Sequence, residues 1–491
     1  MAPESDEVAH PRSGWAALLS GAAVAAAVLA GAALGSDRAA LVTLGLGAGV
    51  LAATAVVLFA PERLAPALLI AFVALVPLRL EKHFAYQVHV GGWPGLRLSV
   101  ADLCLLPLAA LAVYGGLLGR VKNAVPKVVL ALYGLLLVQY GLSALGASHR
   151  DLSAFELTAA VHSLVIVSTV AALFRRRALP WVLAAVAVAV GVHTSFAIVQ
   201  VVTGRPVGLS WLSGSADVVH ESLETGAVRL RPIGLFSHPI VFADFLMLSL
   251  PILAAGAFAA RRRAARASLV AILLFGTVGL VLTLSRGAWI SSAFAFVILL
   301  VLAFRRRLLG RRAFRTVAAG LLVLAAVLAP FAPTIWERFA VSQKGNLEVR
   351  FELNEIALSM IRAHPLAGVG LNNFIEVMRG YDKRDVSRYF PATVHNLYLL
   401  EAAEAGLPAL VLFAGVLAAV FVTGAAGLKR VADPELAWLA AAALAGLAGF
   451  ALSQVADFSH RLEPLRSILW TYVGLLFGAV ASPPERAGAP S

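Results

Sequence analysis

The sequence predicts an all-α fold, a polytopic integral membrane helix bundle with about 14 (12–14) transmembrane helices. Of its 491 residues, 60% are hydrophobic and only 14% are charged, and the mean hydropathy is +0.86. Soluble globular chains are about half apolar and about a quarter charged. Apolar runs of about 17–25 residues recur along the chain, each long enough to cross a hydrocarbon core of about 30 Å. The runs lack the period-2 alternation of membrane β-barrel strands.

The predicted helices correspond to apolar runs that are separated by polar or basic segments. They lie near residues 14–35, 39–60, 64–78, 99–118, 128–146, 156–174, 179–202, 238–259, 268–284, 288–304, 316–335, 397–423, 436–454 and 467–483. The polar start of the chain has no basic segment or cleavage site, so we expect the first run to be a retained helix and not a signal peptide.

Three regions are predicted along the chain. They are the N-terminal transmembrane helices at 1–189, a core at 190–425 that includes external loops at 203–237 and 336–394, and C-terminal transmembrane helices with a short cytoplasmic tail at 426–491.

The net charge of +13 is carried by basic clusters between the apolar runs. The main clusters are Arg175–Arg177, Arg261–Arg266, Arg305–Arg315 and Lys429–Arg430. They fall on one side of the membrane if the helices alternate, and the positive-inside rule makes that side the cytoplasm. Both termini are then cytoplasmic and the long loops external. Because topology accounts for the basic excess, we expect no nucleic-acid partner.

The residue types of common cofactor sites are sparse in this sequence. The single cysteine, Cys104, cannot form an intramolecular disulfide, and no Cys/His spacing is typical of zinc. There is no phosphate-binding glycine loop, and the external loops contain no Asp-x-Asp pair that would hold a divalent metal. We therefore expect no cofactor and no metal site.

The second long loop contains an amphipathic segment from Glu348 to Ile361. Its apolar face consists of Val349, Leu353, Ile356, Ala357, Met360 and Ile361, and its opposite face of Glu348, Glu352 and Glu355. This spacing predicts a helix that ends before Pro365 and lies on the membrane surface or packs on the helix bundle.

Three polar elements meet apolar runs on the predicted external side. The first is Arg229–Pro239, the second is Thr283–Trp289 between two runs, and the third begins at His395 and includes Glu404. An arginine at the centre of a membrane span costs about 2.5–3.5 kcal/mol, so an arginine in the tight second turn either reaches the interface or pairs with an anion. A histidine near the end of a span is more often structural than catalytic, and the residues alone leave both possibilities open.

Taken together, these elements resemble the O-antigen ligase and O-antigen polymerase superfamily, over roughly residues 190–425. The matching residues are Arg231, Gly234 and Pro239 at a span entrance, the Ser285-Arg286-Gly287 turn, Arg350 at the start of a loop helix, the His364–Gly370 segment (His-Pro-Leu-x-Gly-x-Gly), His395–Leu399 (His-Asn-x-x-Leu) and Glu404–Leu407 (Glu-x-Gly-Leu).

The resemblance implies a glycosyltransferase of the bacterial inner membrane. Its donor would be a glycan on a polyprenyl (undecaprenyl) pyrophosphate carrier, and its acceptor a glycan or lipid-linked sugar at the external face. Arginine can replace a metal at the pyrophosphate, because the guanidinium stays protonated and matches phosphate oxygens. Arg231 and Arg286 are the first candidates, followed by Arg229 and Arg350. His395 is the expected general base, and direct attack would invert the anomeric centre.

Other polar residues near these motifs receive supporting or alternative roles. Asn396 suits a helix cap better than catalysis. Glu404 lies two helical turns beyond His395, too far for a direct hydrogen bond, so we expect a structural role. His364 and His238 are alternative bases. Each precedes a proline, which is more typical of a residue in a loop or at the entrance of a span.

The function is predicted only to the level of this superfamily. Ligase and polymerase need the same arginines and base, so the sequence does not separate them. The alternative from another class is a transporter of bicarbonate or another small anion, which should carry its ionisable residues near the bilayer midplane in broken helices. A scaffold subunit without chemistry would tolerate replacement of Arg286 and His395.

Overall fold

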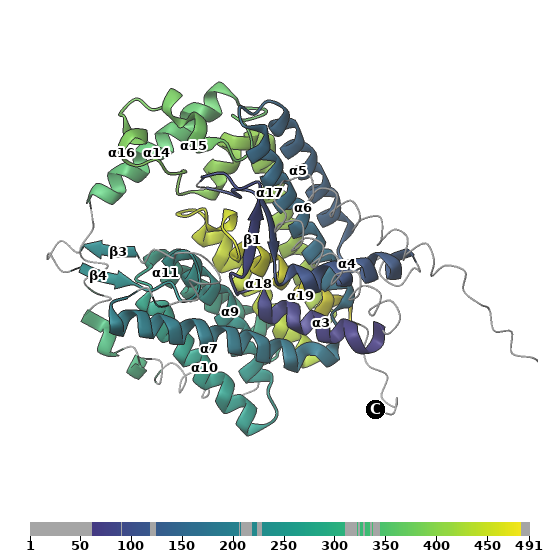
Figure 1. The fold of residues 1–491 in the computed structure, drawn as a ribbon. Helices are drawn as coiled ribbons and strands as arrows, with labels where there is room; N and C mark the ends of the chain where they lie inside the picture. Colours follow the sequence, from purple (N-terminus) through teal and green to yellow (C-terminus); the bar gives the residue numbers. More distant parts are fainter. Residues whose placement is uncertain are drawn as a thin grey trace, which may run out of the picture.

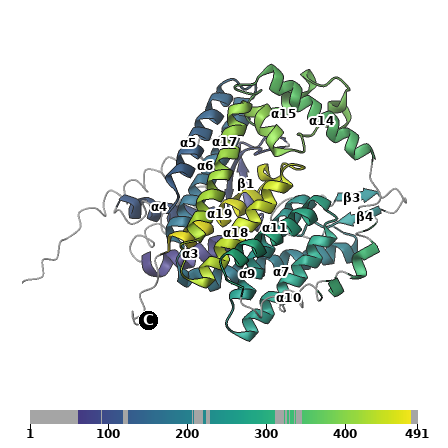
Figure 2. The same ribbon diagram turned by 180° about the vertical axis from the view of Figure 1, so that it is seen from behind.

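The computed structural model describes residues 61–89, 91–117, 124–205, 207, 219–222, 228–309, parts of 322–336, and 344–482. These residues form a mostly helical bundle with a cap of short helices (Figures 1 and 2). Among them, eight helices are long and apolar enough to cross a membrane, and three shorter helices are also apolar. The predicted runs at 14–35 and 39–60 lie outside the described residues, and that at 316–335 lies largely outside them. The helical membrane bundle is thus confirmed, whereas the number of about 14 helices is not.

The helices of the bundle are labelled as in Figure 1. They are α3 (Pro61–Leu75), α4 (Asp102–Leu117), α5 (Lys127–Leu145), α6 (Arg150–Leu173), α7 (Leu179–Thr203), α9 (Pro239–Ala259), α10 (Arg263–Leu282), α11 (Arg286–Arg305), α17 (Leu397–Leu428), α18 (Pro434–Ser453) and α19 (Leu465–Ala481). The cap and the loops add α14 (Lys344–Ala363), α15 (Phe374–Val377), α16 (Val386–Tyr389) and the short 3-10 helices η1 (Arg176–Ala178), η2 (Ala329–Phe331), η3 (Met378–Gly380) and η4 (Ser459–Arg461).

Helix α9 is the central helix of the bundle. It packs against α18, α10 and α11, and nearly all of its side chains are buried. Small residues of α18 permit the close approach, because a Cβ atom on Gly446 would lie 3.1 Å from the carbonyl oxygen of Leu248. A Cβ atom on Gly449 would lie 2.7 Å from the carbonyl oxygen of Ser291. Such small-residue contacts are a common means of packing helices in membranes.

The turns between helices gather at two opposite ends of the bundle. At one end, the basic end, Arg176 pairs with Asp433 at 2.9 Å, and Arg306 donates to the carbonyl oxygen of Lys429 at 3.0 Å. The turn between α10 and α11 and the turn between α18 and α19 lie at the other end, the loop end. Arg261 lies at the same end as Arg176, 3.6 Å from Glu435. The described parts of the basic clusters therefore share one end of the structure.

The cap at the loop end is built from α14, α15 and α16 (Figure 1). Helix α14 confirms the amphipathic prediction, and it ends at Ala363, before Pro365. Its predicted apolar face is buried, with Leu353, Ala357 and Met360 each 0% exposed, in a second core that also includes side chains of α17. Of the two proposed locations for this helix, packing on the bundle is therefore the one observed.

Two small antiparallel hairpins depart from the all-α prediction. Strand β1 (Glu81–Phe84) pairs with β2 (Leu96–Ser99), and β3 (Val219–Ser222) pairs with β4 (Val228–Arg231). Each strand has only four residues. Such short strands carry too little alternation to be predicted from sequence.

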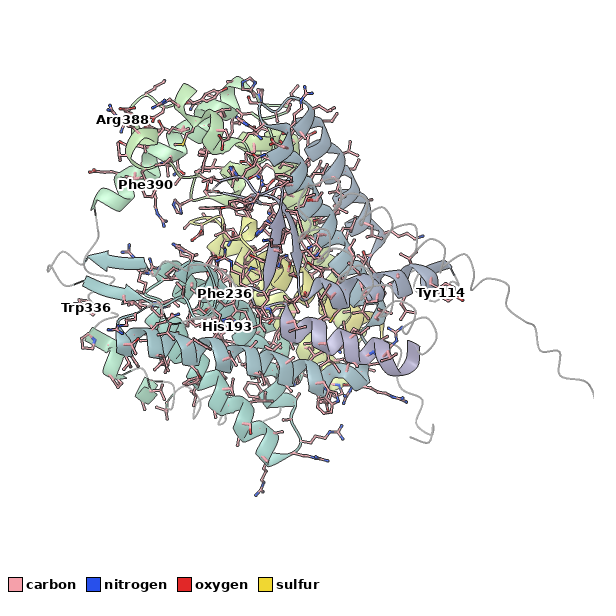
Figure 3. All side chains as sticks on the ribbon, in the orientation of Figure 1. Tyr114, His193, Phe236, Trp336, Arg388 and Phe390 are labelled. Atoms are coloured by element: carbon pink, nitrogen blue, oxygen red, sulfur yellow. The ribbon has the colours of Figure 1, made fainter. Side chains whose placement is uncertain are left out.

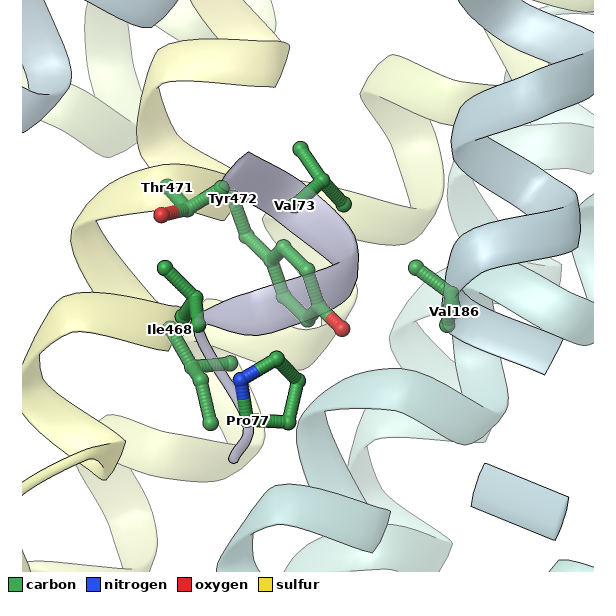
Figure 4. A pocket seen from close by; sticks show the side chains of 7 residues that line it. Val73, Pro77, Val186, Ile468, Thr471 and Tyr472 are labelled. Carbon is green, nitrogen blue, oxygen red and sulfur yellow. The ribbon is translucent and has the colours of Figure 1, made fainter. Parts of the chain in front are cut away.

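The bundle interior leaves little room for ligands where α3, α7 and α19 meet. A cavity of about 10 Å³ there is lined by Val73, Pro77, Val186, Ile468 and Tyr472 (Figure 4). This volume admits at most one water molecule. A sugar would not fit there.

Candidate functional site

His395 lies at the loop end, in the irregular segment that leads from the cap into α17. The next residue, Asn396, is the N-cap of α17, and its Oδ1 accepts a hydrogen bond from the backbone N–H of Leu399 at 3.0 Å. This is the capping role that the sequence predicts for Asn396, and it satisfies one of the unpaired N–H groups at the start of the helix.

The loop between α18 and α19 binds the start of α17 and so fixes the position of His395. The backbone N–H of Leu397 donates to the carbonyl oxygen of Gln454 at 3.0 Å and to that of Asp457 at 2.9 Å. The ring of Phe458 meets the His395 ring edge-on, with 5.3 Å between centroids. The histidine is therefore held from a segment more than fifty residues further along the chain.

His395 is held in its neutral form by its surroundings. Burial, followed by the positive charge of Arg350 and the proximity of His238, lowers its pKa from 6.5 to about 4. Its Nδ1 atom is buried and has no hydrogen-bond partner among the described residues. A neutral imidazole with an unused ring nitrogen can accept a proton.

Arg350 joins the cap to the loop that holds His395. It projects from α14, and its Nη1 donates to the carbonyl oxygen of Ala456 at 3.1 Å. Its charge acts on both His395 and Asp457. The structure therefore brings Arg350 and His395 together, as the family resemblance requires of a shared site.

Arg231 and Arg286 come from two loops that touch at the loop end. Arg231 ends strand β4, and its Nε donates to the carbonyl oxygen of Thr283 at 2.9 Å. Thr283 begins the turn that continues through Leu284, at φ +56°, and Ser285, the N-cap of α11. Arg286 is the first residue of α11 and is itself engaged in an interaction within the structure. Both predicted pyrophosphate ligands thus lie around one short turn.

Arg229, the third candidate ligand of the pyrophosphate, lies in the β3–β4 hairpin. It lies on β4, opposite Glu221 of β3 in the hairpin register, two residues before Arg231. Its backbone is part of the described hairpin, whereas its side chain lies outside the described residues. Arg229 therefore stays a prediction from the sequence.

Arg231, His238, Arg350, His395 and Asp457 form one electrostatic group, which we call the His395 cluster. Arg231 acts on His238, and burial together with this charge lowers the pKa of His238 to about 4. His238 in turn acts on His395, and Arg231 and Arg350 both act on Asp457. The cluster combines three loops and the cap, so only the folded chain assembles it.

Asp457 is the acidic member of the His395 cluster. Burial raises its pKa from 3.8 to about 6, although hydrogen bonding by the Phe458 N–H at 2.7 Å and both arginines oppose that rise. Behind it, Asp244 of α9 contacts the hydroxyl of Ser459 and Nε2 of Gln454. The sequence marks both aspartates as ionisable groups within or near spans, without assigning them work.

Glu404 does not reach His395 and belongs instead to a buried ion cluster inside the bundle. Its carboxylate accepts from the backbone N–H of Asn372 at 2.9 Å and of Phe374 at 3.1 Å, and it lies 3.1 Å from Nη2 of Arg461. These contacts anchor the segment between α14 and α15 on the bundle. They agree with a structural role for Glu404 and explain why its side chain is only 1% exposed.

Arg461 is the centre of this ion cluster. It lies 3.0 Å from Glu156 and 3.0 Å from Glu401, in addition to Glu404, and it is 1% exposed. Arg466 also binds Glu156. An adjacent cavity of about 10 Å³ has room for one water molecule. Buried charges at this density are tolerated only because each has partners.

Helix α17 is broken at Gly406, where φ is +85° and ψ is 167°. The backbone N–H groups of Val369 and Gly370 donate to the carbonyl oxygens of Ala403 at 2.9 Å and Glu404 at 3.0 Å. The side chain of Gln139 binds the carbonyl oxygen of Ala405 at 2.8 Å. The two glycine-containing motifs of the resemblance, His364–Gly370 and Glu404–Leu407, therefore dock directly on one another.

Replacing Gly368 with alanine should destabilise this junction strongly. Gly368 has φ +70°, and an added Cβ atom would lie 2.2 Å from the carbonyl carbon of Glu404. The left-handed backbone and the steric overlap both disfavour alanine, so we expect the free energy of unfolding to fall by more than about 1 kcal/mol. Thermal denaturation in detergent measures the change. Gly380→Ala is the matched control because nothing lies within 4 Å of its Cβ position. Equal melting temperatures for the two variants would contradict the prediction.

His364, the other alternative base, lies apart from the His395 cluster. It is exposed, and its Nε2 lies 2.9 Å from the hydroxyl of Tyr381. Within the described part of the chain, no group of three or more His, Cys, Asp or Glu side chains is placed to hold a metal ion. His395 and His238 both belong to the His395 cluster, but Nδ1 of His238 already accepts from the N–H of Ile240 at 3.2 Å, whereas Nδ1 of His395 has no partner among the described residues.

Sequence analysis missed the two buried arginines and several polar residues that support the site. Arg461 and Arg466 lie in the connection between the predicted helices at 436–454 and 467–483, and they resemble ordinary loop charges in the sequence. Asn372 binds the backbone of Trp93 and of Leu152 at 3.1 Å each, and so ties the cap to a hairpin and to α6. The sequence indicates their roles only weakly, because it shows no more than polar residues near the ends of apolar runs.

The fold is that of a helical integral membrane protein with a polar cluster and a docked cap at one end of its bundle. Residues 269–414 match the family model described as O-antigen ligase. The chain therefore carries a domain of the O-antigen ligase family, and the superfamily that the motifs predict is confirmed.

The family match covers part of the site. It includes Arg286, Arg350 and His395, together with Glu404, and it leaves Arg231 and the loop around Asp457 outside. No curated protein matches the sequence. The family match thus supports glycosyltransferase activity of the O-antigen ligase type in general.

Proposed function

We propose that this protein transfers a glycan from a polyprenyl pyrophosphate carrier to a hydroxyl group of an acceptor sugar. The observation that supports this most directly is the His395 cluster, in which a neutral histidine lies beside Arg350, and Arg231 acts on the neighbouring His238 and Asp457. The family match supports the same class of reaction. The acceptor would be another glycan or a lipid-linked sugar, and the site would face the external side of a bacterial inner membrane.

The arginines suit the leaving group of this reaction. As the bond between the anomeric carbon and the pyrophosphate oxygen breaks, its electron pair leaves with the pyrophosphate, whose negative charge increases. Guanidinium groups donate charge-assisted hydrogen bonds to phosphate oxygens and remain protonated throughout. Arg231 and Arg286 lie around the Thr283 turn, from which they would hold the pyrophosphate.

The neutral histidine suits the attacking group. The acceptor oxygen forms the new bond to the anomeric carbon and gives up its proton, which His395 would take. Attack on the face opposite the pyrophosphate inverts the anomeric centre. Arg350 beside His395 disfavours a protonated imidazole in the unbound protein, and the bound pyrophosphate would offset that charge. Donor binding would therefore strengthen the base when it is needed.

The break in α17 gives little support to the alternative of an anion transporter. Broken helices in transporters leave backbone groups that coordinate the substrate. Here the carbonyl oxygens of Ala403, Glu404 and Ala405 are all bound by groups of the protein itself. The break therefore serves to dock the cap.

The proposed function is tested by the release of polyprenyl pyrophosphate from a purified lipid-linked glycan. The native protein in proteoliposomes, supplied with a range of acceptor glycans and with a chelator present, should release the carrier and extend an acceptor. A ladder of products would indicate polymerisation, and a single addition would indicate ligation. No release by well-folded protein, together with uptake of a labelled small anion, would favour the transporter instead.

The pH dependence should reveal the low pKa of His395. The base form exists above the pKa, so kcat/KM, which reports the unbound enzyme, should fall only as the pH approaches about 4. Protonation of Asp457 near pH 6 removes a negative charge beside Arg231 and Arg350. This change favours binding of the anionic donor, so it should not lower kcat/KM as the pH falls. The acid limb of kcat should lie at higher pH, because the bound pyrophosphate offsets Arg350.

These profiles are measured by carrier release between about pH 3 and about pH 8, at low and at saturating donor, on protein shown to stay folded. The range extends about one unit below the pKa of His395 and about two units above that of Asp457. An acid limb of kcat/KM close to 6.5, the ordinary value for histidine, would contradict the neutral, charge-suppressed His395.

A further inference from the structure

Gln200, a buried residue of α7, binds the backbone turn that follows Arg231. Its Nε2 donates to the carbonyl oxygens of Gly234 and Val207, each at 2.7 Å, and its Oε1 accepts from the N–H of Ile233 at 2.9 Å and of Gly234 at 3.1 Å. The residue is 1% exposed. Two donors and two lone pairs are the full capacity of an amide side chain. All of it is therefore used, with three of the four hydrogen bonds holding the turn and the fourth binding Val207 in the segment after α7.

His193 holds the same turn from one face of α7, seven residues before Gln200. Its Nδ1 accepts from the N–H of Leu235 at 3.2 Å, and its ring stacks on Phe236 with 4.2 Å between centroids. Figure 3 labels the two residues, which lie close together in the bundle. Gly234 has φ +59°, and a Cβ atom there would lie 3.0 Å from the carbonyl oxygen of His193. The turn is thus bound in one position against α7.

Arg231 is connected to this turn through a single stiff residue. Pro232, whose ring restricts φ, lies between Arg231 and the Ile233 N–H that Gln200 binds. On its other side, the guanidinium of Arg231 donates to Thr283. The position of the guanidinium therefore depends on the Gln200-bound backbone as well as on the turn that precedes Arg286.

We infer that Gln200 is a positioning residue for Arg231, holding its guanidinium where the pyrophosphate of the donor binds. This inference rests on the proposed function, and it deepens it by assigning a residue of α7 to the donor site. Gln200 lies outside residues 269–414, the part of the chain that matches the O-antigen ligase model. It contacts no substrate in this scheme and acts only through the backbone before and after Gly234.

Gln200→Met tests the inference, because methionine fills similar space and makes none of the four hydrogen bonds. We expect kcat/KM for the lipid-linked glycan to fall about tenfold or more, mainly through a higher KM for the donor. Thr194→Val is the matched control on the same helix, since the buried Thr194 hydroxyl has no hydrogen-bond partner among the described residues. That control should retain native kinetics.

A double-mutant cycle with Arg231→Ala separates positioning from a general loss of structure. If Gln200 acts through Arg231, adding Gln200→Met to Arg231→Ala should cause no further loss of kcat/KM. The same fold-loss in both backgrounds would overturn the inference, and so would native kinetics in Gln200→Met itself. Rates are compared per mole of monodisperse protein after size-exclusion chromatography.

Amide hydrogen exchange distinguishes this inference from failure of the proposed function. Gln200→Met should accelerate exchange at Ile233 and Gly234 about tenfold or more, whether or not the protein transfers glycans. Faster exchange in a protein without transferase activity would refute the proposed function, but it would support the conclusion that Gln200 holds the turn after Arg231. Unchanged exchange would refute the inference that Gln200 holds this turn, whatever the transferase activity of the protein.

Discussion

Replacing His395 with alanine should lower the rate of glycan transfer by about 10²–10⁴, the usual effect of removing a general base. The reason is local: His395 is the neutral imidazole beside Arg350, with an unpartnered Nδ1 and a pKa of about 4. Without it, the proton of the acceptor hydroxyl has no designated recipient as the new glycosidic bond forms. The measurement is single-turnover release of polyprenyl pyrophosphate from lipid-linked glycan.

His364→Ala provides the matched control for this prediction. His364 is also a histidine of the cap region, but it is exposed and bound to Tyr381, outside the His395 cluster. Its replacement should leave the transfer rate within about threefold of native, the ordinary scatter for a residue without a role in the chemistry. The assignment of His395 fails if both variants lose activity equally, or if His395→Ala transfers glycan at the native rate.

Replacing Arg461 with methionine should destabilise the protein by about 3–5 kcal/mol, the typical cost of breaking a buried ion pair. Arg461 is the shared partner of Glu156, Glu401 and Glu404. Its loss would leave three buried carboxylates near a single guanidinium, that of Arg466. We expect a lower thermal transition in detergent and loss of the cap's attachment, because Glu404 also binds the backbone at 372 and 374.

Arg384→Met is the control for burial. Arg384 also pairs with two carboxylates, Glu352 and Glu355, both at 3.5 Å, but its side chain is 59% exposed. Surface ion pairs contribute about 0–1 kcal/mol, so this variant should unfold close to the native temperature. A similar, small effect in both variants would mean that the Arg461 cluster is not the buried anchor inferred from its geometry.

Local patterns in the sequence account for much of what could be predicted of the site. The apolar periodicity around Leu353 and Met360 predicts α14 and its buried face, and Asn396 before an apolar run predicts a helix cap. Both depend on neighbours within a few residues, so a single sequence contains the necessary information. The short hairpins were missed because four-residue strands carry almost no such pattern.

The pairings of the site could not be predicted in this way. Arg466 binds Glu156, which is 310 residues earlier in the chain, and Arg350 binds the backbone at Ala456. Gln200 appears in the sequence as one polar residue near the end of an apolar run. Which polar groups meet across the bundle depends on how the helices pack, and apolar periodicity does not encode that packing in a transmembrane helix that is apolar on every face.

The sequence by itself determined that this chain is a helical membrane protein, which end of its helices carries the basic clusters, and which motifs resemble the O-antigen ligases. Composition and charge placement suffice for the first two conclusions because the lipid environment imposes them on each segment separately. The motifs can be recognised because each is a short run of neighbouring residues. Only the tertiary structure decided that Asp457 joins Arg231, Arg350 and His395 in one cluster, and that Glu404 belongs to a buried anchor. Those outcomes rest on contacts between distant segments, which exist only once the bundle has packed.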